Sequence, residues 1–141
     1  MYRVMVSAAF SAAHRLRLPG GGYEPPHGHD WQVQARFTGD ELDETGMLVD
    51  FEAVHGALTA VLEQLHHTDL NACPLMAGIN PTAENVARIV FDALRRRVSR
   101  PDLLESVQVV EAPGCIAAYH PGPQARPPRR PAAVDDVVGD R

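Results

Sequence analysis

The chain has 141 residues, 45% of them hydrophobic, and a formal net charge of −5 with thirteen arginines and no lysine. This length supports one globular domain with a core, and the scattered arginines argue against a nucleic-acid surface, which needs a basic stripe. The absence of lysine excludes a lysine Schiff base, although the N-terminal amine remains available for one. Because neither a membrane span nor a signal-peptide pattern is present, we expect a cytoplasmic protein that binds neither nucleic acid nor membrane.

Two stretches near the N-terminus predict neighbouring strands. Residues 3–11 are rich in valine and alanine and lead into His14, and apolar residues alternate with polar ones from His29 to Phe37. Residues 19–26, between the two stretches, contain three glycines and three prolines, which predicts an irregular loop. The alternation puts His29 on the apolar face, so its ring should face a protein cavity.

Two amphipathic helices are expected next. Asp50 is a plausible N-cap for the first, since apolar residues recur at helical spacing over residues 51–65. Asn80 or Thr82 can cap the second, which ends at the arginines of residues 95–97, where cations complement the helix dipole.

The C-terminal part of the predicted domain consists of two strands. Residues 106–111 and 115–120 have strand composition and are joined by a tight turn, whereas residues 121–141 are rich in proline and predict a disordered tail. The order strand, strand, helix, helix, strand, strand predicts an α+β fold over residues 1–120, in which two helices cover one face of an antiparallel four-stranded sheet.

Three histidines form a candidate metal site. His27 and His29 flank Gly28, and both rings can point at one ion if the backbone twists through the glycine. His14 follows the first predicted strand and offers a third imidazole. Three neutral imidazoles suit a catalytic zinc, which keeps its fourth position open for water or substrate.

Several segments, in this order, resemble the 6-pyruvoyl-tetrahydropterin synthase and 6-carboxy-tetrahydropterin synthase family. They are Phe10-Ser11-Ala12-Ala13-His14, His27-Gly28-His29, Gly46-Met47-Leu48-Val49-Asp50-Phe51, Leu70-Asn71, Asn80-Pro81-Thr82-Ala83-Glu84-Asn85, and Glu111 followed by Tyr119. The resemblance implies the ββααββ T-fold. It also implies homotrimers whose strands join into a barrel, usually paired into homohexamers, with active sites between subunits.

The resemblance assigns roles to individual residues. It implies that His14, His27 and His29 bind zinc and that the carboxylate of Glu111 anchors the N–H edge of a pterin ring, much as a carboxylate pairs with a guanidinium. Thr82 and Ala83 match positions near this anchor, although Thr82 is equally expected to act as a simple helix cap.

The proton-transfer residues depart from the family pattern. The family has a cysteine base four residues before the first histidine of the His-x-His motif, and this chain has Tyr23 there. A phenol near its ordinary pKa of about 10 is a poorer base than a thiol near 8.5. Some family variants carry a carboxylate close to the missing cysteine, and the adjacent Glu24 could imitate them.

A second departure affects the catalytic histidine. The family's Asp-His pair reads His66-His67 here, so the histidine persists as His67 while its aspartate partner is His66. Asp69 is the nearest stand-in for the lost carboxylate. We expect His67, helped by Asp69 or Tyr23, to replace the thiol as the base, because an imidazole accepts a proton at neutral pH.

The sequence thus predicts a zinc-dependent lyase of this family that acts on a dihydropterin resembling dihydroneopterin triphosphate. Two alternatives remain. The same scaffold could serve as a zinc-dependent aldolase or cyclase on a non-pterin carbonyl compound in specialised metabolism, which the loss of the cysteine and aspartate favours. It could also be a non-catalytic pterin or purine binder, which the retained Glu111 allows.

Overall fold

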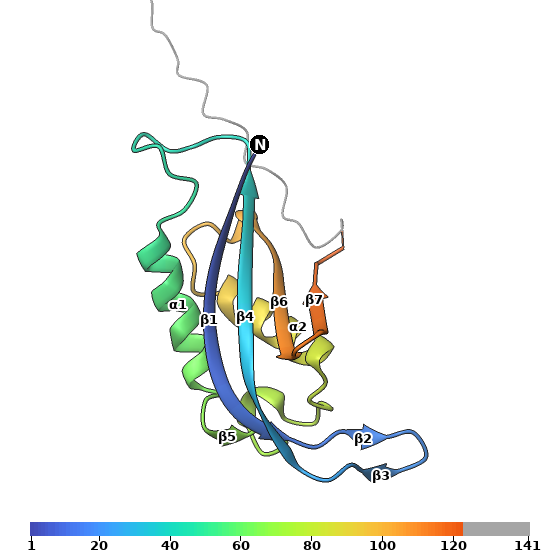
Figure 1. Cartoon of the computed structure of the whole chain (residues 1–141). Coiled ribbons are helices and arrows are strands. Elements are labelled where there is room, and N and C mark those ends of the chain that lie inside the picture. Colours follow the sequence, from blue (N-terminus) through green and yellow to red (C-terminus); the bar gives the residue numbers. More distant parts are fainter. Residues whose placement is uncertain (123–141) are drawn as a thin grey trace, which may run out of the picture.

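The computed structural model describes residues 1–122. Its centre is a sheet with the strand order β5-β1-β4-β6-β7 (Figure 1). The four longer strands are β1 (Tyr2–His14), β4 (His27–Gly39), β6 (Leu104–Ala112) and β7 (Cys115–Tyr119). Each of them pairs antiparallel with the next one in this order. The predicted α+β fold and its antiparallel four-stranded sheet are confirmed. A two-residue strand, β5 (Thr68–Asp69), adds a parallel fifth member beside β1.

Both predicted helices form and lie on the same face of the sheet (Figure 1). Helix α1 (Phe51–Glu63) begins after Asp50, whose carboxylate accepts hydrogen bonds from two backbone N–H groups of the first turn. Helix α2 (Ala83–Arg95) begins after Thr82, so Thr82 rather than Asn80 is its cap. Two short 3-10 helices, η1 (Pro74–Met76) and η2 (Pro101–Leu103), complete the chain's helical segments within the described residues.

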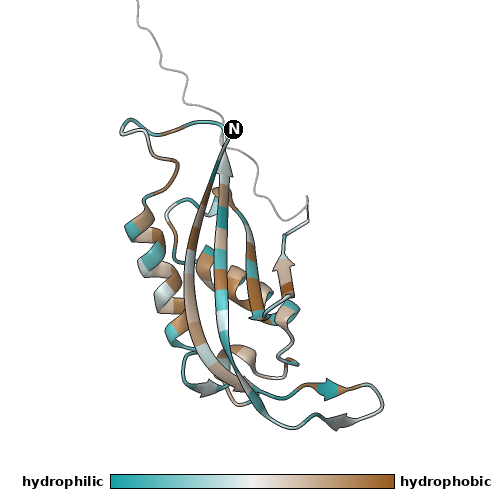
Figure 2. Ribbon diagram, viewed as in Figure 1, coloured by the Kyte–Doolittle hydropathy of each residue, from teal (hydrophilic) through white to brown (hydrophobic). Residues whose placement is uncertain are grey.

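The core lies between the sheet and the two helices. Alternate residues of β1 and β4 face it, which gives the apolar banding of the strands in Figure 2. Phe10 and Trp31 pair across the β1–β4 ladder and stack with ring centroids 5.6 Å apart. His14 is fully buried on this same covered face, two residues beyond Ala12.

The other face of the sheet is covered by no described element. It carries Ser11, Asp30, Gln32 and other polar side chains, together with Met5 and Ile116, which are 48% and 59% exposed. Large apolar side chains on an open sheet face indicate a surface that associates with another molecule.

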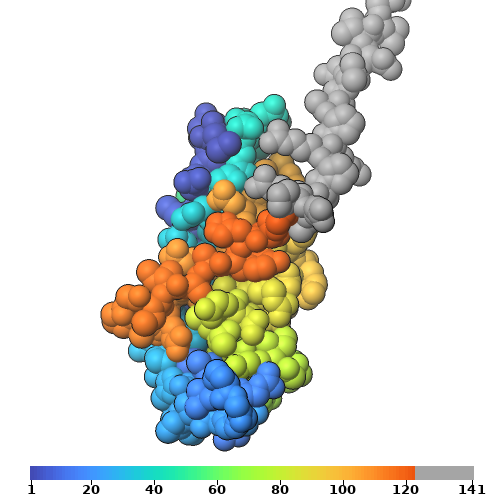
Figure 3. Space-filling view, turned by 90° about the vertical axis from the view of Figure 1, so that its right-hand side faces the viewer, coloured from blue at the N-terminus to red at the C-terminus, as the bar shows by residue number. Residues whose placement is uncertain are grey.

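The predicted loop at residues 19–26 is partly wrong, because a small hairpin forms there. Strands β2 (Arg17–Leu18) and β3 (Gly22–Tyr23) pair antiparallel and make one end of the molecule (Figures 1 and 3). Gly20 and Gly21 adopt φ values of 88° and 91°, which other residues rarely adopt, and so allow the reversal. The glycines that predicted an irregular loop therefore build the turn of a hairpin.

Two further observations complete the description. The predicted tail, residues 121–141, lies outside the described residues from position 123 onward. Of the helices that the structure describes, none is long and apolar enough to span a bilayer.

Candidate metal centre and active site

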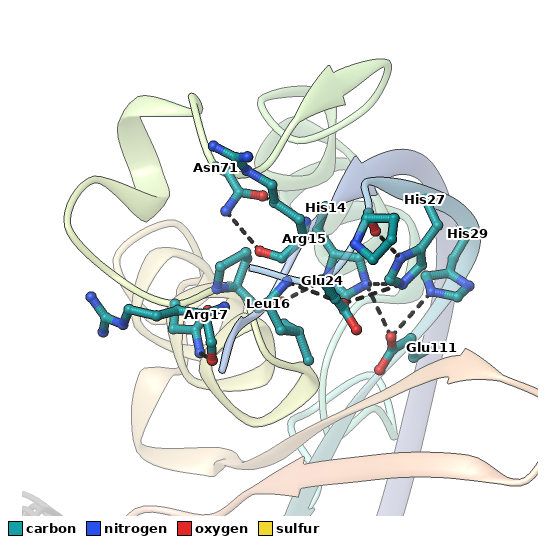
Figure 4. A network of polar contacts seen from close by, with 12 residues as sticks. His14, Arg15, Leu16, Arg17, Glu24, His27, His29, Asn71 and Glu111 are labelled. Atoms are coloured by element: carbon teal, nitrogen blue, oxygen red, sulfur yellow. Dashed lines mark hydrogen bonds and ion pairs between the residues drawn. The ribbon is translucent and has the colours of Figure 1, made fainter. Parts of the chain in front are cut away.

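The three candidate histidines and Glu111 meet at one point (Figure 4). One ligand atom from each of these four side chains lies within 4.8 Å of the other three. His14 ends β1 and pairs in register with His27 at the start of β4, while Glu111 lies near the end of β6. We call His14, His27, His29 and Glu111 the metal cluster. The cluster forms where β1 and β6 end and β4 begins, on the covered side of the sheet.

The expected backbone twist at Gly28 does not occur. Gly28 pairs with Ala13 in the regular β1–β4 ladder and is not among the residues with positive φ. His27 and His29 point the same way because side chains two positions apart in a strand share a face. An ordinary strand therefore positions both rings.

The hydrogen bonds of two histidines fix their tautomers. Nδ1 of His14 donates to the carbonyl of Pro81 at 2.8 Å, and Nδ1 of His27 donates to the carbonyl of Pro25 at 3.0 Å. A carbonyl oxygen can only accept, so each Nδ1 carries the proton and each neutral ring has a lone pair on Nε2. The two Nε2 atoms lie 3.0 Å apart. A cation between them would remove this repulsion.

The remaining members of the metal cluster show that a metal ion fits better than a proton. Oε1 of Glu111 lies 3.0 Å from Nε2 of His14 and 3.1 Å from Nε2 of His29. Despite that short distance, the buried Nε2 of His29 has no partner in hydrogen-bonding geometry. A proton bridges only two atoms, whereas four possible metal-ligand atoms converge here. Three imidazoles and a carboxylate match the ligands of zinc.

Glu24 stands beside the metal cluster, at its rim. Its Oε1 accepts a hydrogen bond from the backbone N–H of Leu16 at 3.1 Å and lies 3.6 Å from Nε2 of His27. The backbone N–H of Glu24 in turn donates to the carbonyl of Leu16 at 3.0 Å. Hydrogen bonds at its carboxylate and at its backbone N–H therefore orient Glu24. About a quarter of its side chain is exposed (27%).

Two asparagines hold residues 15–17, a role that the sequence did not predict, since Asn80 was expected only as a possible helix cap. Asn71 accepts from the N–H of Arg15 and donates to its carbonyl, both at 2.8 Å. Asn80 does the same for Arg17, at 2.8 and 3.2 Å. Each amide thus pairs with both backbone groups of one residue, as a neighbouring strand would. Both asparagines belong to the motifs that carry the family resemblance. This membership was the sequence signal that could have identified them.

Tyr23 lies at the surface of the hairpin. Its side chain is 52% exposed, and the guanidinium of Arg15 lies 4.3 Å above its ring. The residue at the family's cysteine position therefore contributes to a cation–π contact on the hairpin. Glu24, its neighbour, is the residue that reaches the candidate site.

The histidine pair after α1 is fastened to β1. Nδ1 of His66 accepts a hydrogen bond from the N–H of Ser11 at 3.0 Å, and the N–H of His67 donates to the carbonyl of Ser11 at 2.7 Å. The two rings stack with centroids 3.6 Å apart. His67 has a φ of 56°, an unusual conformation for a non-glycine residue. Asp69 accepts from the N–H of Asn71, so its observed partner is a backbone turn and not His67.

His67 lines an open pocket of about 360 Å³ whose other lining residues include Ser11, Gly28 and Asp30. Ser11 and Asp30 alternate along their strands with buried residues, and Oγ of Ser11 donates to Asp30 at 2.5 Å. This pocket therefore lies on the open face of the sheet, whereas the metal cluster lies on the covered face. His29, a member of the metal cluster, also lines this pocket.

The start of α2 lies next to the cluster, because His14 is hydrogen bonded to Pro81. Thr82 caps the helix by accepting from the N–H of Asn85 at 3.2 Å, and Ala83 is the first helical residue. The predicted cap role of Thr82 is thus confirmed. Contact of Thr82 or Ala83 with a substrate stays a prediction.

Comparison with known proteins identifies the family of this chain. Residues 3–122 match the family described as 6-pyruvoyl tetrahydropterin synthase. The 6-carboxy-5,6,7,8-tetrahydropterin synthase of Bacillus subtilis (strain 168) is 32% identical over 120 residues, which cover 79% of this chain and 80% of that protein. A solved structure of Caenorhabditis elegans 6-pyruvoyl tetrahydropterin synthase superposes with a TM-score of 0.75 at 27% identity, covering 85% of this chain and 95% of that one.

A more distant structure shares the fold. It is a Plasmodium vivax 6-pyruvoyltetrahydropterin synthase in which a catalytic glutamate is replaced by alanine, with a TM-score of 0.70 and 18% identity, covering 85% of this chain and 97% of that one. The match over residues 3–122 includes every member of the metal cluster. The chain belongs to the 6-pyruvoyl tetrahydropterin synthase family.

Proposed function

We propose that this protein is a zinc-dependent lyase that acts on a dihydropterin resembling dihydroneopterin triphosphate. The observation that carries the proposal is the convergence of the metal cluster, above all the two facing Nε2 lone pairs of His14 and His27. His14, His27 and His29 would hold the metal. A bound zinc supplies a Lewis acid that polarises a substrate oxygen and makes the neighbouring C–H group acidic.

We propose Glu24 as the proton acceptor. Its Oε1 lies 3.6 Å from Nε2 of His27, and the N–H of Leu16 donates a hydrogen bond to that same oxygen. A carboxylate oriented beside a substrate position can act as a general base, and the orientation reduces the cost of reaching the reactive geometry. The Plasmodium vivax synthase also has a catalytic glutamate. These observations favour Glu24 over Tyr23, which faces Arg15 instead.

We propose that His67 acts in the active site of a neighbouring copy. Its pocket includes Ser11 and Asp30 of the open face, although His29 of its own metal cluster also lines it. The open face carries exposed apolar side chains, which supports association of copies through this surface. His67 can then hold or move a proton in the site of the adjoining chain, while Glu24 serves its own site. Glu111, with Thr82 and Ala83 nearby, would hold the pterin ring.

The test is incubation of the zinc-loaded protein with dihydroneopterin triphosphate, followed by mass spectrometry of the products. We expect loss of triphosphate or a shortened side chain. The matched control is His27→Ala, which removes a metal ligand at the partly exposed edge of the cluster. An unchanged substrate with the fully zinc-loaded wild type would contradict the proposal, and turnover by a zinc-free His27→Ala would contradict the role of the metal.

A further inference from the structure

The segment after helix α1 is attached to β1 through a side chain as well as through its backbone. Residues 66–69 lie beside β1, where β5 forms its parallel pairs (Figure 1). The N–H of His67 donates to the carbonyl of Ser11, and the N–H of Ser11 donates to Nδ1 of His66. In a regular sheet a backbone carbonyl would accept from the N–H of Ser11, so an imidazole nitrogen replaces that carbonyl here. We call the bond from Ser11 to His66 the His66 contact.

The His66 contact requires a neutral imidazole. A backbone N–H can only donate, so Nδ1 of His66 must hold a lone pair and the single ring proton must be on Nε2. A protonated ring carries an N–H group at both positions and cannot accept. A carbonyl keeps its lone pairs at every pH, whereas histidines change charge between about pH 5 and pH 8. Protonation of His66 therefore ends the contact.

The groups around the His66 ring do not compensate for a positive charge on it. Asp30 of β4 and Asp69 of β5 accept hydrogen bonds from other groups, and Glu63 ends α1 three residues before His66. Within residues 1–122, none of these carboxylates forms an ion pair with the ring. The titratable group in contact with it is the His67 ring, at a centroid distance of 3.6 Å. Two imidazolium rings at this distance repel each other, so charge on one disfavours charge on the other.

The two stacked histidines offer different groups to the pocket. Neutral His66 has no free ring lone pair, because Nδ1 accepts from Ser11 and Nε2 carries the proton. The His67 ring has no hydrogen-bond partner among residues 1–122 and lines the pocket of about 360 Å³. The bond to the carbonyl of Ser11 holds the backbone of His67 at a φ of 56°, which is unfavourable for a residue with a side chain. Of the pair, His67 is therefore the ring that can accept a proton in the pocket.

We propose that His66 is a positioning residue whose protonation releases residues 66–69 from β1. At neutral pH the His66 contact holds these residues on the strand and presents the His67 ring to the pocket. As the pH falls through about 6, Nδ1 of His66 changes from acceptor to donor and the ring leaves Ser11. Because the folded state binds the neutral ring, the contact stabilises the fold at neutral pH, and this contribution is lost on acidification. The inference rests on the proposed function only for its effect on turnover.

The first experiment measures hydrogen–deuterium exchange of single amides in the zinc-loaded protein at about pH 7.5 and pH 5.5, on either side of the range expected for the change. After correction for the intrinsic effect of pH, the protection of the Ser11 amide should fall at least about fivefold at the lower pH, the size of one lost hydrogen bond. The Leu70 amide is the internal reference, because it donates to the carbonyl of Ala13 and not to an imidazole. Unchanged protection of Ser11, or an equal loss at Leu70, would overturn the inference.

Two variants separate the His66 contact from metal loss, which acid also causes. His66→Asn places an amide oxygen near the position of Nδ1, so it keeps the acceptor but takes up no proton, and His66→Leu removes the acceptor. We expect the Ser11 amide to be protected at both pH values in His66→Asn and at neither in His66→Leu. Circular dichroism checks that both variants are folded. A loss of protection in His66→Asn as large as in wild type would assign the effect to another group and overturn the inference.

Turnover tests the consequence for function. At neutral pH, His66→Leu should lower kcat at least about tenfold with little change in KM, because the His67 ring is misplaced, and His66→Asn should recover most of the loss. Equal kcat in wild type and His66→Leu would overturn the positioning role. An inactive wild type that shows the pH-dependent exchange of Ser11 would refute the proposed function and support the His66 contact, so the two failures are distinguishable.

Discussion

Nε2 of His14 and Nε2 of His27 lie 3.0 Å apart, and each ring donates its Nδ1 proton to a backbone carbonyl. In this arrangement the Nε2 lone pairs of the two neutral imidazoles face each other. The arrangement is costly unless a cation lies between them, and the carbonyls of Pro25 and Pro81 hold both rings in the tautomer that leaves Nε2 free to bind one.

The first prediction concerns metal content. Purified protein supplied with zinc should carry close to one zinc per chain, as measured by plasma mass spectrometry, because the metal cluster offers three imidazoles. His27→Ala should lose most of it. His66→Ala is the control, since His66 lies outside the cluster and should leave zinc content unchanged. Wild type that stays metal-free after zinc addition would refute the site.

The second prediction concerns the base. Glu24→Gln should lower kcat by about a hundredfold or more, the usual size of a general acid–base contribution, while its zinc content stays near that of wild type. Tyr23→Phe should have little effect, because the phenol contacts Arg15 at the surface. Full activity in Glu24→Gln combined with an inactive Tyr23→Phe would return the role to the family's cysteine position.

The third prediction concerns His67. His67→Ala should also reduce kcat by about a hundredfold. If His67 serves a neighbouring copy, refolding a mixture of inactive Glu24→Gln and His67→Ala chains should restore activity, in roughly a quarter of the sites for random mixing in a ring. Unmixed samples refolded alone are the control. A mixture that stays inactive would place both residues in the site of one chain.

The fourth prediction concerns the asparagine that holds the segment after His14. Asn71→Ala removes two hydrogen bonds to Arg15, so the free energy of unfolding should fall by about 1–3 kcal/mol. Asn71→Asp keeps the acceptor but loses the donor and should be affected less. The measurement is urea unfolding, with Glu63→Ala on the exposed end of α1 as a near-neutral control. Equal stability of Asn71→Ala and wild type would contradict it.

The fifth prediction concerns assembly. The sheet has an open face and a short edge strand, β7, so we expect a homotrimer or homohexamer by light scattering. Ile116→Arg should shift the protein toward monomer, because its 59% exposed side chain lies on that strand. Leu42→Arg, in the loop before α1, is the control. A wild type that is monomeric at micromolar concentration would refute the association.

The elements and the candidate metal ligands could be read from the sequence because they depend on local pattern. The helix caps at Asp50 and Thr82 work through hydrogen bonds two or three residues along the chain. The alternation along β4 likewise placed His29 on the covered face, and it required no knowledge of the rest of the fold.

Other features depended on contacts between distant segments. The hairpin at β2 and β3 was expected to be a loop, because glycine and proline content indicates turns without revealing which flanking residues pair across them. The contact of Glu24 with His27, and the attachment of Arg15 by Asn71, join residues whose proximity follows only from the folded hairpin.

By itself, the sequence determined the strand and helix order, the caps and the three histidines, since each follows from periodicity or from residue chemistry within a few positions. Only the tertiary structure decided how the candidate catalytic groups divide between the two faces of the sheet. Glu24 lies beside His27, whereas His67 lies in the pocket that Ser11, Asp30 and His29 also line. The position of Glu111 beside the histidines was also decided by tertiary structure, because the pairing of β4 with β6 brings the end of β6 to the start of β4.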